Sequence, residues 1–332
     1  MNFAILNSIF RSIFNNHVLY YVSFSSMFYI NIVGFGIFIS FIIQFLTGVL
    51  LSCYYSSFFI ISFYSILYIL FSVFIGYVLK SLHSIFAVFF VSFVYIHLLR
   101  GVWLRYLSLN YLYIVWLSGI LLLVLCIMEG FIGYILNYGQ MSYWGYMVLC
   151  GLCSILGYYI YGGMMEIVWC SGYVVVYRVF LLHFMIGWII GVFIWLHIYV
   201  LHGIGSNNPM VMSISSFIMS FKLVGLKDIM MVVLMVMSIL EWMGYMDGDI
   251  FGNEDNLEVA NPLSTPEHIV PEVYFDFLFY LLRCISIKYV GVYGVGGLVC
   301  VMVGFVKFRL VNFAIILSIH YYKMRIIELI RI

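Results

Sequence analysis

Four histidines, arranged as two equal pairs, are the side chains in this sequence best suited to chemistry. His83 and His97 are fourteen residues apart, and so are His183 and His197. Fourteen residues are nearly four helical turns, about 21 Å of rise, so the members of a pair share one helix face at two depths. Two such helices side by side present one imidazole each at either depth. This pattern predicts two metal centres, one above the other.

Glycines repeat the same period in two further apolar stretches. Gly34 and Gly48 are fourteen residues apart, as are Gly119 and Gly133. A porphyrin edge pressed between helices needs positions without side chains, where the backbone can come close. Each glycine alone is explained by ordinary helix packing, but the matched set favours clearance for haem.

The composition around these residues is that of a polytopic membrane protein. Of the 332 residues, 66% are hydrophobic and only 8% are charged, whereas soluble domains carry about 25% charged residues. The net charge of +1 and the lack of a basic tract give no indication of nucleic-acid binding. The odd number of cysteines, scattered in apolar sequence, favours packing over disulfides. We also expect no removable signal peptide.

Histidines buried in a membrane allow four interpretations. Ionisable residues at that depth are rare and usually functional, although a lone histidine can simply be hydrogen-bonded in the core. Zinc prefers one tight set of four ligands, whereas ligands split between two levels suit two haems, each held by two imidazoles. A haem-free transporter or proton channel with buried histidines remains an alternative from a different class.

The elements that position these residues are long apolar helices. We expect membrane spans at residues 28–51, 76–103, 113–135, 174–202, 229–245, 290–306 and 313–322. Residues 54–79 are also apolar. If residues 54–79 do not cross the membrane, all basic clusters fall on one membrane face and the acidic segment 247–272 falls on the other, as the positive-inside tendency favours. We therefore expect residues 54–79 to lie on the membrane surface. This gives seven or eight spans, with residues 138–175 as a surface loop containing short helices.

The expected fold class is an all-α polytopic membrane protein with two parts. Residues 1–208 form an N-terminal four-helix bundle that binds two haems. Residues 209–332 form a smaller C-terminal group of transmembrane helices and carry the loop 247–274. The last apolar run, residues 313–322, is short for a span.

At this point the sequence resembles cytochrome b of the respiratory quinol–cytochrome c reductase (complex III), over about residues 28–308. The paired histidines and glycines match that family's haem ligands and haem-facing glycines. Stretches 133–145, 201–209 and 255–274 are similar to its quinone-site segments. The family's Pro-Glu-Trp-Tyr signature reads Pro271-Glu272-Val273-Tyr274 here.

The resemblance implies which histidines share a haem. His83 and His183 would ligate the low-potential haem near the acidic segment 247–272, which we call the acidic loop. His97 and His197 would ligate the high-potential haem on the basic side. Arg100 and Arg178 match basic residues of the family. Their guanidinium groups would pair with haem propionates, or they would serve as interfacial anchors.

The resemblance also implies two quinone sites. At the quinol-oxidising site, Glu272 would accept a proton, unless it is simply a solvated loop acid; the residues shaping the pocket would be Tyr134, Gly139, Met141 and Tyr274. At the quinone-reducing site, a histidine facing an aspartate could deliver protons; its residues would be His202, Ser206, Lys227 and Asp228. Lys227 and Asp228 also fit a plain surface ion pair.

The function implied is that of a membrane subunit of ubiquinol–cytochrome c reductase. It would carry two b-type haems, oxidise quinol at one face and reduce quinone at the other, coupled to proton translocation in a Q cycle. The implied partners are a Rieske iron–sulfur protein, a c-type cytochrome, other complex III subunits, membrane lipid and a second copy of the complex. Phe, Tyr and Ile are abundant, with 31 Phe and 29 Tyr, which fits an AT-rich, organelle-encoded gene. This composition favours the mitochondrial inner membrane over a bacterial plasma membrane. A di-haem anchor of another quinone-linked oxidoreductase is the closest alternative.

Overall fold

Four long helices form the body of the molecule. The computed structural model describes residues 22–24, 32–103, 113–160, 175–204, 218–245, 252–284 and 288–304. Within this part of the chain, four helices are long and apolar enough to cross a membrane: α2 (Ile32–Ser52), α4 (Gly76–Trp103), α5 (Tyr113–Ile135) and α8 (Val175–Ile204). Each exceeds the roughly 20 residues that a bilayer core of about 30 Å requires.

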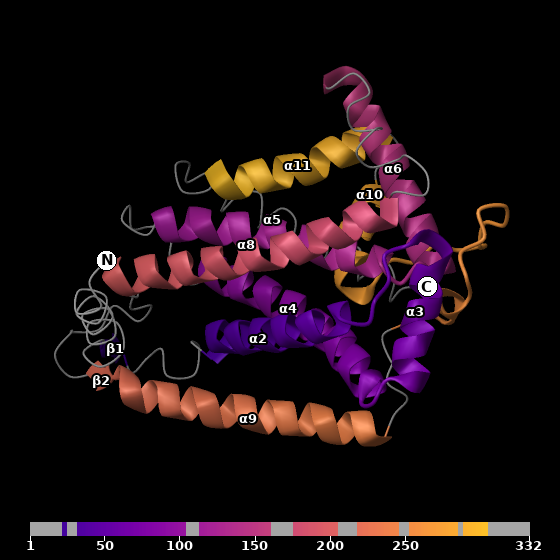
Figure 1. Ribbon diagram of the computed structural model, residues 1–332. Helices are drawn as coiled ribbons and strands as arrows, with labels where there is room; N and C mark the ends of the chain where they lie inside the picture. Colours follow the sequence, from indigo (N-terminus) through magenta and orange to yellow (C-terminus); the bar gives the residue numbers. More distant parts are fainter. Residues whose placement is uncertain are drawn as a thin grey trace, which may run out of the picture.

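These helices pack in two intimate pairs. Helix α2 lies against α4, and α5 lies against α8, and Figure 1 shows all four running alongside one another. Most of their surface is exposed apolar side chain, as expected of helices that face lipid. The buried core is narrow and includes Phe86, Ile132, Ile135 and Ile190, each at most 2% exposed.

The stretch after α2 forms a helix too short to span a bilayer. Helix α3 (Phe59–Ser72) has 14 residues, about 21 Å of rise against a core of about 30 Å. Figure 1 shows it across one end of the bundle. The hydroxyl of Tyr55, just before α3, donates to the carbonyl oxygen of Leu136 at 2.9 Å. A surface location for residues 54–79 is consistent with this geometry and stays a prediction.

The region after α5 differs from expectation. Residues 138–175 were predicted to form a loop with short helices, but α6 (Gln140–Ile160) is one continuous helix of 21 residues. Glycine costs a helix at most about 1 kcal/mol per position, and packing can offset that cost. The prediction of short helices is therefore wrong for residues 140–160, while residues 161–174 lie outside the described chain.

The C-terminal part adds further elements around the bundle. They are α9 (Phe221–Tyr245), the 3-10 turns η7 (Glu254–Leu257) and η8 (Val273–Phe275), α10 (Asp276–Cys284) and α11 (Lys288–Gly304). A short antiparallel pair joins β1 (Val22–Phe24) to β2 (Ile218–Ser220). The expected span at 313–322 lies outside the described residues. The predicted all-α membrane class is confirmed, with this strand pair as a small addition.

Candidate functional site

Each glycine of the repeated set faces one histidine. A Cβ atom added to Gly34 would lie 3.6 Å from Cε1 of His97, and one added to Gly48 would lie 3.1 Å from Cε1 of His83. The earlier glycine thus meets the later histidine, so α2 runs antiparallel to α4. The missing side chains let the α2 backbone approach both imidazoles of α4.

Helices α5 and α8 repeat this arrangement. A Cβ atom on Gly119 would lie 3.3 Å from Cε1 of His197, and one on Gly133 would lie only 2.8 Å from Cε1 of His183. The last distance is closer than real Cβ contacts, so even alanine at Gly133 would displace the ring. The bundle therefore holds its imidazoles at two levels, which we name by their histidines: a first level with His83 and His183, and a second with His97 and His197.

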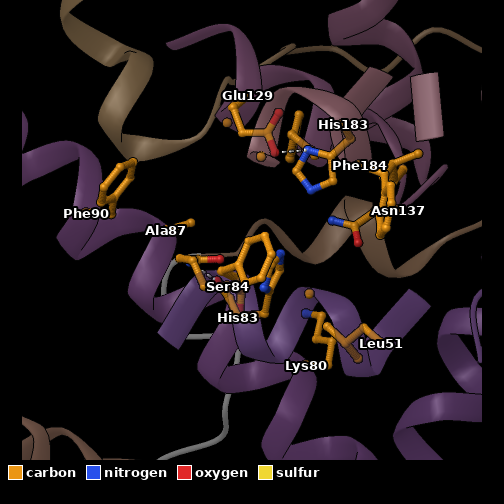
Figure 2. A pocket seen from close by; sticks show the side chains of 18 of the residues that line it. Leu51, Lys80, His83, Ser84, Ala87, Phe90, Glu129, Asn137, His183 and Phe184 are labelled. Carbon is orange, nitrogen blue, oxygen red and sulfur yellow. Dashed lines mark hydrogen bonds and ion pairs between the residues drawn. The ribbon is translucent and has the colours of Figure 1, made fainter. Parts of the chain in front are cut away.

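The two imidazole rings of the first level are as far apart as two rings that ligate the same metal ion. Their centroids are 6.3 Å apart and their planes cross at 86°. A metal ion between two imidazole nitrogens, with bonds of about 2 Å each, separates the ring centres by roughly 6 Å. Figure 2 shows His83 and His183 approaching from different helices across an open space. The residues at this level thus fit a group that takes two axial imidazoles.

Hydroxyl groups orient two of the imidazoles. Thr47 Oγ1 lies 2.9 Å from Nδ1 of His83, and Ser118 Oγ lies 2.7 Å from Nδ1 of His197. A partner on Nδ1 leaves Nε2 for a metal and fixes the ring orientation. The sequence analysis missed both residues, although each directly precedes a glycine of the repeated set.

A carboxylate takes the corresponding place beside His183. Oε1 of Glu129, from α5, lies 3.1 Å from Nδ1 of that histidine. The sequence analysis also missed Glu129. Its signal was an acid within an otherwise apolar span, the same rule that singled out the histidines.

The first level opens into a cavity that reaches the acidic loop. Its lining includes both first-level histidines together with Glu129, Tyr134, Glu272 and Tyr274. Residues more than 130 positions apart in the chain, such as Tyr134 and Glu272, therefore meet in one space. Tyr274 is 8% exposed, and its carbonyl oxygen accepts a hydrogen bond from the Tyr95 hydroxyl at 3.3 Å. Burial, reinforced by nearby Glu272, raises the pKa of the Tyr274 phenol well above its usual value, so this group stays protonated.

Comparison with known families identifies this architecture. A model of the family described as cytochrome b/b6/petB matches residues 18–205, and one for the C-terminal part of cytochrome b, b6/petD, matches residues 259–329. The chain belongs to the cytochrome b/b6 family.

Individual relatives of this cytochrome b/b6 chain support the same family assignment. It is 36% identical over 258 residues to cytochrome b of Paraspadella gotoi, a match that covers 76% of this chain and 66% of that relative, slightly less than two thirds of its length. Among solved structures, a chain of a hyperthermophilic respiratory complex III superposes with a TM-score of 0.78 at 25% identity. That match covers 92% of this chain and 81% of the other. The four membrane-length helices among the described residues make this an integral, multi-pass membrane protein.

Two residues predicted to shape the quinol pocket, Gly139 and Met141, lie in the turn that contacts the acidic loop. Gly139 packs on the acidic loop, where an added Cβ would lie 2.3 Å from the carbonyl oxygen of Asn256. The next residue, Gln140, donates its backbone N–H to the carbonyl oxygen of Glu258 at 3.0 Å. Met141 is 1% exposed in the core. Neither Gly139 nor Met141 is among the residues that line the first-level cavity; the turn they belong to anchors the loop instead.

The residues predicted for a second quinone site lie near the opposite end of the bundle. Nζ of Lys227 is 2.7 Å from Oδ1 of Asp228, and the aspartate is 5% exposed. The sequence left open a surface ion pair between these two residues; the pair is present, but its aspartate is buried. His202 lies in the last turn of α8, and Figure 1 places that end of the helix at the same end of the bundle as the start of α9. Ser206 lies outside the described residues.

The two predicted propionate partners lie at opposite ends of their helices. Arg100 is in the last turn of α4, three residues after His97. Arg178 is in the first turn of α8, five residues before His183. Each arginine is therefore at the end of the bundle nearest one level, where a guanidinium could meet a carboxylate at the membrane boundary.

Proposed function

We propose that the chain is the cytochrome b subunit of a quinol–cytochrome c reductase. It would oxidise quinol at the acidic-loop face, reduce quinone at the opposite face and couple the two to proton translocation. The observation that carries this proposal is the pair of imidazole levels, each with its own facing glycines. The division into residues 1–208 and 209–332 belongs to the same proposal.

The residues present fit two b-type haems. His83 and His183 would hold one, and His97 and His197 the other. Bound haems supply one-electron carriers at two depths of the membrane. The protein contributes the spacing, because fourteen residues place the levels about 21 Å apart along each helix. It also contributes rigid ring orientations. Arg100 and Arg178 would bind the propionates of the haem nearest to each.

The cavity gives the chain a way to take protons from quinol. Glu272 lines the space beside the first level and would accept a hydroxyl proton. Tyr274 is buried and protonated, so it can donate a hydrogen bond to a quinol oxygen. Tyr134, from the end of α5, closes another side of the cavity.

At the opposite end, proton delivery to a quinone would fall to His202 and Asp228. The ion pair with Lys227 holds the buried Asp228 carboxylate in place. An imidazole side chain can both take up and release a proton, which suits it to proton delivery. Ser206 follows His202 closely in the chain and would complete this site.

The proposal extends to partners and location. A Rieske iron–sulfur protein, a c-type cytochrome, other complex III subunits and a second copy of the complex would complete the reaction. The match to a chain of a respiratory complex III supports this assembly. We place it in the mitochondrial inner membrane, on the composition given above.

A reduced-minus-oxidised difference spectrum of the purified protein tests the proposal. We expect a b-type haem band that titrates in two one-electron steps, because the chain has two imidazole levels. A colourless preparation would instead support a haem-free transporter. A b-type band without co-purifying iron–sulfur and c-type subunits would support the membrane anchor of another quinone-linked oxidoreductase.

Replacing Glu272 with glutamine tests the proton acceptor. We expect quinol–cytochrome c turnover to fall about 100-fold, since an amide cannot accept the proton and general-base groups contribute at least that much. The haem spectrum should be unchanged, because Glu272 lies in a loop and not on a ligand helix. Turnover of the complex and its spectrum are the measurements.

The matched control is Glu267→Gln, which removes an exposed acid of the same loop. Its turnover should stay near that of the unaltered protein. If both variants lose activity equally, the loop as a whole is responsible and Glu272 has no special role.

A further inference from the structure

Glu129 is an acid within a membrane-length helix that makes a specific contact. It lies on α5, four residues before Gly133, and its Oε1 is 3.1 Å from Nδ1 of His183. Figure 2 shows the carboxyl group directed at that imidazole. A Cβ on Gly187 would lie 3.4 Å from the same oxygen, so the absence of a side chain there leaves room for the carboxyl group. An ionisable group at this depth is costly, which makes a functional reason the default expectation.

The contact makes the two levels chemically unequal. At the second level, the partner of His197 Nδ1 is the neutral hydroxyl of Ser118. Nδ1 of His97 is also buried, and no carboxylate among the described residues lies within ion-pair distance of it. At the first level, His83 has the hydroxyl of Thr47, and His183 has a carboxylate. Only the first level therefore combines a hydroxyl with a carboxylate.

A carboxylate is a stronger hydrogen-bond acceptor than a hydroxyl. When it accepts from Nδ1–H of a ligating imidazole, it increases the basicity of Nε2 on the other side of the ring. A more basic ligand stabilises ferric iron relative to ferrous iron. Hydrogen bonding beyond the ligands is one of the means by which a protein sets the reduction potential of a haem.

We propose that Glu129 is a positioning residue that accepts a hydrogen bond from Nδ1–H of His183 and so lowers the reduction potential of the first-level haem below that of the second. This inference rests on the proposed function, because it requires haem at both levels. It assigns the potential difference to a side-chain pair of this chain. Electrons would then pass favourably from the acidic-loop end to the other end.

The experiment is a potentiometric titration of the b-type absorbance in membranes that contain the assembled complex. Glu129→Ala should raise the first-level potential by at least a tenfold change in the ferric-to-ferrous ratio, ~59 mV for a one-electron couple. Glu129→Gln should shift it less in the same direction, because the amide oxygen still accepts a hydrogen bond. The low-spin ferric EPR signal of this haem should move with the potential, and the second-level potential should stay in place.

Ser118→Ala is the matched control, since it removes the Nδ1 partner of His197. It should alter only the second-level haem. An unchanged first-level potential in Glu129→Ala would overturn the inference while leaving the proposed function intact. If that variant loses its first-level haem, Glu129→Gln decides: an upward shift supports the inference, and no shift or a downward one overturns it. Absence of a b-type signal in the unaltered protein would defeat the proposed function itself.

Discussion

Replacing His97 with alanine is expected to abolish one of the two haem signals and leave the other. His97 belongs to the second level, and the first level is about four helical turns away with its own glycines and hydroxyl partner. Loss of one axial imidazole removes half of the ligand pair at that level alone. In a redox titration of the b-type absorbance, two steps should become one, and the surviving step should be the lower-potential one.

Two further variants serve as controls for this experiment. His83→Ala should remove the other step and spare the one that His97→Ala abolishes. His268→Ala changes an exposed histidine of the acidic loop and should keep both steps. Two steps surviving in His97→Ala would mean that His97 is not a ligand, and the division into two levels would fail.

The two-level arrangement could be predicted because it is a property of helical geometry. A spacing of fourteen residues returns to nearly the same face whatever the helix packs against. The same spacing predicts that the two glycines of each pair also share one helix face. The structure adds which glycine meets which histidine, and this depends on helix direction. Gly48 could have faced either level until the antiparallel run of α2 and α4 placed it beside His83.

The partners of the imidazoles could not be predicted with equal ease. Whether Thr47, Ser118 or Glu129 reaches an Nδ1 atom depends on how far each helix is rotated about its axis. Hydroxyl groups in these helices also bond to a carbonyl of their own preceding turn, as Ser84 of α4 does to Ser81 at 3.1 Å and Ser118 itself does to Val115 at 2.9 Å. Composition does not separate these two roles. Glu129 is a different case: it was not predicted, although the cost of burying an acid in a membrane-length helix is itself a signal for a functional role.

The start of α6 illustrates packing that overrides local preference. Its glycines and tyrosines suggested a loop, since glycine disfavours helix. In the structure this turn is tied to the acidic loop: the backbone N–H of Ser142 donates to the side-chain oxygen of Asn256 at 3.0 Å, and that of Asn261 donates to the side chain of Gln140 at 2.8 Å. These contacts join residues more than 100 positions apart, which no local window of sequence contains.

Adding a single methyl group at Gly133 is expected to have the second large effect. In Gly133→Ala the new Cβ would lie 2.8 Å from Cε1 of His183. The ring must then move, because a packed helix pair cannot absorb such an overlap without displacement. Haem at the first level should fall to a small fraction of its normal content, with the second level retained. The measurement is haem per polypeptide together with the amplitudes of the two redox steps.

The same substitution at the four glycines should have effects of different size, because the added Cβ would come to a different distance from the imidazole at each position. The added Cβ would lie 3.1 Å from the imidazole at Gly48, 3.3 Å at Gly119 and 3.6 Å at Gly34. We therefore expect the loss to decrease in that order, with Gly34→Ala nearly normal because its contact is of ordinary van der Waals length. Gly225→Ala in α9 has nothing within 4 Å and is the control; it should keep both haems and gain up to about 1 kcal/mol of helix stability. Equal haem content in Gly133→Ala and Gly225→Ala would show that close backbone approach to the imidazoles is not what these glycines provide.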